Sequence, residues 1–233
     1  MKIHKNYRFR SRPKNTPYAP SLDVSIDEYR LPIDFCKSLE QLMHQEVKDL
    51  SYKSWHTYNI FSIESPVITR FKSFIDDMLI NYEDTENLWI NGWVNYSEEG
   101  ECIRRHNHSI HENSYLTGSL CLCDRDDVST YFWVPIISDD RSYGGPLEFK
   151  SLTGRLIVFP SYIPHEVTTL PIGGGTRMTV AFDLITSDAI SYFKKNSNDK
   201  NDPLYRAVLS LIHISEPTRR YAIAYAVVCV KKK

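Results

Sequence analysis

The hydrophobic pattern of the chain changes its period near residue 88. Before that position, residues 32–50 and residues 65–81 repeat apolar side chains at helical spacing. In each segment the phenylalanine, methionine and aliphatic side chains of the repeat share one face, which is typical of helices packed against a core. After that position, apolar and polar residues alternate, as they do along β-strands. The pattern predicts two helices followed by a β domain.

The β domain is predicted to consist of about eight short strands. Clusters of glycine, proline, aspartate and serine separate them, and no helical segment lies between them. This arrangement is typical of a jelly roll, also called a double-stranded β-helix. We therefore expect a mainly β fold with flanking α-helices, the helices packed outside the larger sheet. The predicted strands are residues 88–96, 101–108, 115–123, 130–136, 147–150, 154–159, 165–169 and 176–184.

These patterns divide the chain into five segments. Residues 1–20 form a basic arm that is extended, disordered or added as a strand to a sheet edge, and residues 21–87 form a helical region packed on the barrel. Residues 88–186 form the jelly-roll core, and residues 187–208 form a polar C-terminal extension. Residues 209–233 resemble a translated sequencing adapter that runs into a poly-A tract, so we expect a non-native tail there.

The charge balance gives no indication of a nucleic-acid partner. The formal net charge is −1, and it becomes −5 without residues 209–233, because that segment contains five basic residues and one acidic residue. A mildly acidic body lacks the basic surface that binds nucleic acid or anionic membranes. No apolar run is long enough to span a bilayer.

The cysteines indicate a reducing compartment. Four of them lie before residue 209, and they are scattered along a chain in which no secretory signal is recognised. We therefore expect free thiols and a cytoplasmic protein. Cys121 and Cys123 would share a strand face, where two small buried side chains fit better than a metal pair. The four cysteines are Cys36, Cys102, Cys121 and Cys123.

Three histidines carry the candidate chemistry. His106 and His108 form a His-x-His pair in a predicted strand, where residues two apart share a face. His165 follows the apolar run 156–159 and a proline turn, at the start of another predicted strand. Imidazoles from two strands can surround one ion and leave coordination positions open for a substrate. The sequence therefore predicts a mononuclear metal site.

The last predicted strand places a cation on one face. Arg177, Thr179, Ala181 and Asp183 alternate with apolar residues and therefore share that face. An arginine that points into a barrel is costly unless it meets an anion. The guanidinium fork suits a carboxylate, to which Thr179 can add a hydroxyl donor. The alternative is a salt bridge from Arg177 to Asp183 or Glu148.

Eight elements follow one another along the chain: Trp93–Asn95, Gly100, His106–His108, Leu116–Leu122, Gly145–Phe149, Gly154–Pro160, His165 and Arg177–Thr179. Their order resembles a 2-oxoglutarate/Fe(II) oxygenase family across about residues 88–185. The resemblance implies that His165 binds iron and that Arg177 and Thr179 hold the distal carboxylate of 2-oxoglutarate. It implies a dioxygenase that hydroxylates a small-molecule or protein substrate, which the sequence does not identify.

Position 108 departs from many relatives in the wider superfamily, which have an aspartate or glutamate as the second ligand. Either three histidines bind the metal or a nearby acid joins them, and Glu112 is the candidate acid. Glu112 also completes a resemblance to the first cupin motif, whereas Tyr162 and Thr169 depart from the second. The alternatives are a cupin-type isomerase or dioxygenase that does not use 2-oxoglutarate, and a non-enzymatic metal-binding jelly-roll module.

Overall fold

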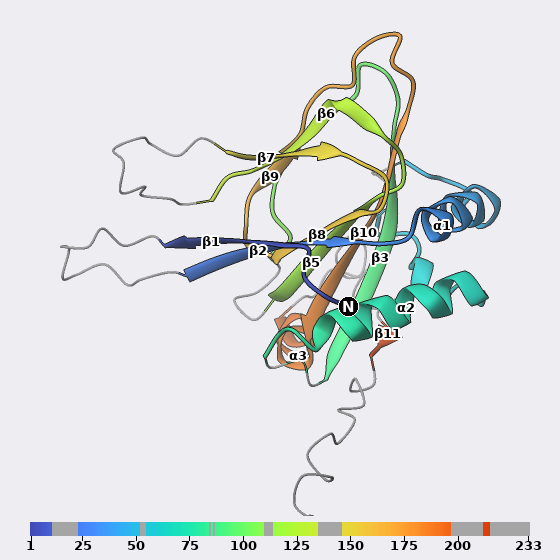
Figure 1. Ribbon diagram of the computed structural model, residues 1–233. Coiled ribbons are helices and arrows are strands. Elements are labelled where there is room, and N and C mark those ends of the chain that lie inside the picture. The colour runs from blue at the N-terminus through green and yellow to red at the C-terminus, as the bar shows by residue number, and fades with distance from the viewer. Residues whose placement is uncertain are drawn as a thin grey trace, which may run out of the picture.

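Two antiparallel sheets that face each other form the core of the computed structural model (Figure 1). The structure describes residues 1–10, 23–51, 55–83, 85, 87–109, 114–134, 146–196 and 212–214. The larger sheet contains β1 (Lys5–Arg10), β2 (Asp23–Arg30), β3 (Leu88–Ser97), β5 (Ser114–Cys121), β8 (Arg155–Pro160), β10 (Arg177–Thr186) and β11 (Ile212–His213). The smaller sheet contains β4 (Ile103–His106), β6 (Arg125–Phe132), β7 (Leu147–Ser151) and β9 (His165–Val167).

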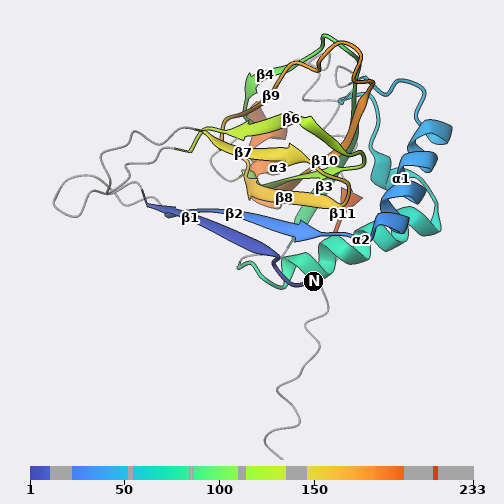
Figure 2. The same ribbon diagram turned by 45° about the horizontal axis from the view of Figure 1, so that its top comes forward.

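The strand order confirms the predicted jelly roll. The larger sheet runs β1-β2-β8-β5-β10-β3-β11 and the smaller sheet runs β4-β9-β6-β7. Neighbours along the sheets are therefore mostly distant in sequence, as in a double-stranded β-helix. Figure 2 shows the two sheets as layers, with the helices beside the larger one.

Two helices cover the outer face of the larger sheet, as predicted. They are α1 (Ile33–Glu46) and α2 (Pro66–Leu79), and a short 3-10 turn, η2 (Ile60–Ser62), lies between them in sequence. The Ser65 hydroxyl accepts a hydrogen bond from the Val67 amide and caps α2, while Pro66 occupies the first turn. The apolar stripes of both helices join one buried cluster with the sheet, which includes Phe35, Leu39, Phe71, Ile75, Val94, Val158, Val180 and Phe182.

Strand β10 separates this core from the interior of the barrel. Its alternate residues Met178, Val180, Phe182 and Leu184 belong to the cluster under the helices. Because side chains alternate along a strand, the residues between them point to the other face, toward the smaller sheet. The predicted division of β10 into an apolar and a polar face is thus present in the structure.

Gly118 on β5 makes room for the ring of Phe182. A Cβ atom at position 118 would overlap that ring. We expect Gly118→Ala to lower the free energy of unfolding by about 1–3 kcal/mol, because overpacking forces neighbouring side chains to move. Urea denaturation measures the effect, and adding Phe182→Leu to Gly118→Ala is expected to recover part of it. Unchanged stability of the single variant would contradict this packing.

The N-terminal region contains strands in addition to its helices. Strand β2 opens the segment 21–87 that was expected to be helical, and it pairs with β8. Its alternation is masked in the sequence because Asp27 and Glu28 are both buried. The Tyr82 hydroxyl donates to Asp27 at 2.7 Å, and Arg155 donates to Glu28 at 3.0 Å. Residues distant in sequence therefore supply the partners that let these acids occupy a strand.

Three other predicted segments also contain secondary structure. Residues 5–10 of the basic arm form the edge strand β1, which is one of the conformations expected for residues 1–20. The polar extension 187–208 begins with the helix α3 (Ser187–Asn196), which the sequence pattern did not predict. Within the expected tail 209–233, Ile212 and His213 pair with β3. That this tail is non-native stays a prediction.

Among the described residues, no helix combines the length and the apolar character needed to cross a bilayer.

Candidate metal centre and its cavity

A cavity of about 690 Å³ lies between the two sheets. Its walls come from the inner faces of both sheets, from the segment after β4 and from Trp55, which precedes η2. It contains most of the residues for which the sequence predicted chemistry. Among the lining residues are His106, His108, His165, Arg177, Thr179 and Asp183.

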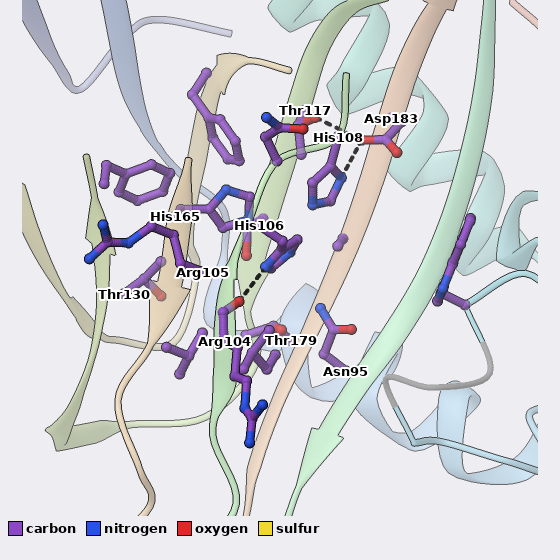
Figure 3. Close-up of a pocket in the computed structure, with 18 of the residues that line it drawn as sticks. Asn95, Arg104, Arg105, His106, His108, Thr117, Thr130, His165, Thr179 and Asp183 are labelled. Atoms are coloured by element: carbon purple, nitrogen blue, oxygen red, sulfur yellow. Dashed lines mark hydrogen bonds and ion pairs between the residues drawn. The ribbon is translucent and has the colours of Figure 1, made fainter. Parts of the chain in front are cut away.

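Strand pairing brings the three histidines together. In the register of β4 and β9, His106 and His165 are direct partners. His108 follows the end of β4, and its backbone amide donates to the Ser161 carbonyl at 2.8 Å. One ring nitrogen from each histidine lies within 4.8 Å of the others. Figure 3 shows the three rings pointing toward one another, so the predicted cluster exists as a group that can hold a metal ion.

The hydrogen bonds of the three rings all use Nδ1 and leave Nε2 free. In each ring, Nδ1 contacts an oxygen that can only accept, so Nδ1 carries the proton. The Nε2 lone pairs are then available to a metal, in the manner of metal-binding histidines whose other nitrogen donates to an oxygen. The acceptors are the Arg104 carbonyl for His106 at 2.7 Å, the Asp183 carboxylate for His108 at 2.8 Å and the Ile163 carbonyl for His165 at 3.1 Å.

Burial keeps two of these rings neutral. It lowers the pKa of His106, and the neighbouring His108 lowers it further. Burial also lowers the pKa of His165 well below its usual value, with His108 and His106 adding to the effect. Rings of Phe132 and Phe159 pack against His165, with centroids at 5.5 Å and 4.8 Å. Neutral imidazole is the form that binds a metal.

These shifts predict that acid destabilises the metal-free protein. Below about pH 6.5 the unfolded chain binds protons that the folded His165 excludes, so the free energy of unfolding falls as the pH falls. We expect wild-type protein to lose more stability than His165→Gln between pH 7.5 and pH 5.0. Denaturant unfolding of both metal-free proteins across this range measures the difference. Parallel pH profiles would contradict the burial of a neutral His165.

Arg177 is buried in the same cavity, at 3% exposure. Its Nε donates to the Ser151 hydroxyl at 2.9 Å, and its Nη2 donates to the Thr130 hydroxyl at 3.3 Å. Its Nη1 and the hydroxyl oxygen of Thr179 are buried without a hydrogen-bond partner. A buried polar atom without a hydrogen-bond partner lowers the stability of the fold, and a bound ligand could supply the missing partners of these two atoms.

The alternative salt bridges of Arg177 are not formed. The Asp183 carboxylate accepts from His108, and the Glu148 carboxylate accepts from Ser129 and Lys150. Within the described residues, no carboxylate forms an ion pair with Arg177.

Two thiols lie near the guanidinium of Arg177. A hydrogen bond from Cys123 lowers the pKa of the Cys121 thiol, and the charge of Arg177 lowers it further. A thiolate there offsets part of the cost of burying the cation. The Nη1 atom of Arg177 nevertheless stays without a partner.

Aromatic and basic side chains surround the centre. The Trp93 ring stacks on His108, with centroids 5.5 Å apart, and Trp55 also lines the cavity. At the exposed side, the Arg105 guanidinium lies 3.6 Å from the centroid of Trp133. Arg104 is the second exposed cation that lines the cavity. The cavity therefore has an aromatic wall and a basic rim.

Sequence reasoning found the histidines but missed the role of one acid. Glu112, the proposed carboxylate ligand, lies outside the described residues. The sequence pattern offers Asp183 as a salt-bridge partner of Arg177, whereas in the structure Asp183 accepts a hydrogen bond from His108. The alternation of β10 is the sequence feature that indicates this role, because it places Asp183 on the strand face that points into the barrel.

Comparison with known proteins gives similarity of structure but not of sequence. No family model and no curated protein sequence matches the chain. A prolyl-4-hydroxylase of Pseudomonas putida is similar with a TM-score of 0.55 and 15% identity, covering 69% of this chain and 92% of that one. A prolyl hydroxylase of Trichoplax adhaerens has a TM-score of 0.52 and 12% identity, over 72% and 86%.

A third solved structure includes ligands. HygX of Streptomyces hygroscopicus, with nickel and 2-oxoglutarate bound, has a TM-score of 0.51 and 12% identity, covering 70% of this chain and 82% of that one. These neighbours are 2-oxoglutarate/Fe(II) oxygenases, and at such low identity the likeness shows the fold. The chain therefore has the double-stranded β-helix fold of the 2-oxoglutarate/Fe(II) oxygenases, with a three-histidine cluster inside it.

Proposed function

We propose that this protein is a 2-oxoglutarate- and Fe(II)-dependent dioxygenase that hydroxylates a small-molecule or protein substrate. One observation carries the proposal: a single cavity holds three converging histidines and a buried arginine that has no carboxylate partner among the described residues. A metal ion held by the three histidines would suit one end of a keto dicarboxylate, and the arginine suits the other.

The three histidines fit an Fe(II) ion. Their free Nε2 atoms offer three nitrogen donors, and imidazole is a ligand that suits iron. His106, His108 and His165 would hold the ion through one atom each, and the cavity beside them would leave room for a keto acid and dioxygen. When bound, Fe(II) supplies the activation of dioxygen that is coupled to decarboxylation of 2-oxoglutarate to succinate and CO₂.

Arg177 and Thr179 fit the distal carboxylate of 2-oxoglutarate. The unsatisfied Nη1 of Arg177 and the unsatisfied hydroxyl of Thr179 lie on the same face of β10. A carboxylate there satisfies both groups and neutralises the buried cation. Ser151 and Thr130 hold the guanidinium in place before the ligand arrives, which reduces the cost of ordering it on binding.

The substrate is expected to occupy the part of the cavity between the metal centre and the exposed rim. Trp55 and Trp93 give that part an aromatic wall. Arg104 and Arg105 lie at the rim, where they favour the approach of an anionic group.

Formation of succinate from 2-oxoglutarate tests the proposal. We expect turnover to stop when a chelator removes the metal, to return with added Fe(II) and to be absent in His165→Ala. The assay follows succinate with limiting protein under air. Turnover that persists in the metal-free protein or in His165→Ala would contradict the proposal.

A further inference from the structure

Asp183 joins the candidate metal centre through His108 (Figure 3). Its Oδ1 accepts from His108 Nδ1 at 2.8 Å and from the Thr117 hydroxyl at 2.7 Å. The side chain comes from the inner face of β10 and is 16% exposed. Its carboxylate is therefore close to the centre without belonging to the group of converging ring nitrogens.

A short chain of hydrogen bonds fixes the direction of this contact. A carboxylate can only accept, so the single Thr117 proton goes to Asp183. The 3.2 Å contact between Thr117 and Ser161 must then use the proton of the Ser161 hydroxyl. The Ser161 carbonyl also accepts from the His108 amide. The backbone and the ring of His108 are thus held from two sides by one network.

Asp183 differs in kind from the acceptors of the other two rings. His106 and His165 donate to backbone carbonyls, which carry no net charge. Among the three, only His108 donates to a carboxylate, and it occupies the position at which many members of the wider superfamily have an acidic ligand. A hydrogen-bonded carboxylate makes an imidazole a stronger donor to a metal and fixes its tautomer.

We propose that Asp183 is a positioning residue that replaces, one hydrogen bond away, the acidic ligand absent at position 108. It fixes Nδ1–H on His108, directs Nε2 at the metal and places one negative charge beside the centre. This inference rests on the proposed metal site.

The stacked ring of Trp93 provides the second constraint on His108. The two ring planes lie 26° apart with centroids at 5.5 Å. Asp183 sets which nitrogen is protonated, whereas Trp93 limits tilting of the ring. Only the first of these effects requires a charge, which makes the two separable by substitution.

Asp183→Asn tests the proposal, because it keeps the volume and removes the charge. We expect Co(II) binding to the metal-free protein, measured by competition with a chelating indicator, to weaken about 10–100-fold. Thr117→Val, which removes only the supporting hydroxyl, is expected to have a smaller effect in the same direction. The melting temperature of each metal-free variant reports separately on folding.

Glu166→Gln is the matched control. Glu166 is another carboxylate beside the cluster, next to His165 in sequence, but it pairs with Arg105 at 3.4 Å rather than with a candidate ligand. We expect its removal to leave Co(II) affinity unchanged. An equal loss in both variants would show a general charge effect and overturn the specific role of Asp183.

The tautomer of His108 gives a readout independent of metal and activity. In ¹⁵N spectra of the metal-free protein, we expect Asp183→Asn to change the His108 signals and to leave those of His106 and His165 in place. Unchanged Co(II) affinity in Asp183→Asn would overturn this inference alone. Failure of wild-type protein to bind Co(II), Fe(II) or Zn(II) would overturn the proposed function as well.

Discussion

Replacing Arg177 by glutamine is expected to weaken 2-oxoglutarate binding about 100-fold. The guanidinium is fully enclosed, and its free Nη1 has no other partner among the described residues. Losing a charge-assisted carboxylate contact in such a place costs about 3 kcal/mol, which corresponds to about 100-fold in affinity. Titration of 2-oxoglutarate into the metal-loaded protein under argon measures the change, and metal affinity is expected to stay close to that of wild type.

Arg104→Gln is the control for this experiment. Arg104 lines the same cavity but is exposed at its rim. If general positive charge attracted the ligand, both substitutions would weaken binding alike. Equal affinities of Arg177→Gln and wild type would contradict the assignment of Arg177, and they are the result that a cupin-type enzyme predicts.

Removing one of the three histidines is expected to have the second large effect. His106 is the most solvent-accessible of the three histidines, although its ring is partly buried among the other two, so the fold should tolerate His106→Ala. Because removing a partner behind a ligand already costs 10–100-fold in metal affinity, loss of the ligand itself should cost more than about 100-fold. Metal content after dialysis against Fe(II) under argon, together with Co(II) competition, measures the loss.

His44→Ala is the matched control for the histidine experiment. His44 lies in the last turn of α1 and contacts Tyr96, away from the cavity lining. We expect it to bind metal as wild type does. Retention of one metal per chain in His106→Ala would contradict the three-histidine centre.

Local patterns predicted the strands in which an apolar face alternates with a polar face. The alternation of β10 placed Arg177, Thr179 and Asp183 on one face, and all three line the cavity. The helical stripes likewise predicted α1 and α2, although α1 ends at Glu46 rather than near residue 50. In these elements, the side that each residue faces depends on spacing alone.

Elements that depend on distant partners were not predictable in the same way. Strand β6 begins at Arg125, inside a cluster of acids that resembles a turn, because Arg125 binds Asp127 and the Gly175 carbonyl. The contact between His108 and Asp183 joins residues 75 apart in sequence. Such contacts follow from strand order, which no local pattern encodes.

Binding of 2-oxoglutarate to the protein with and without metal tests the central claim most directly. Calorimetry under argon, with Fe(II)-loaded and metal-free protein, measures both the stoichiometry and the dependence on metal. We predict one metal ion and one 2-oxoglutarate per chain, with tight 2-oxoglutarate binding only when the metal is present. Binding of 2-oxoglutarate that is equally strong without metal, or absent with it, would contradict the account.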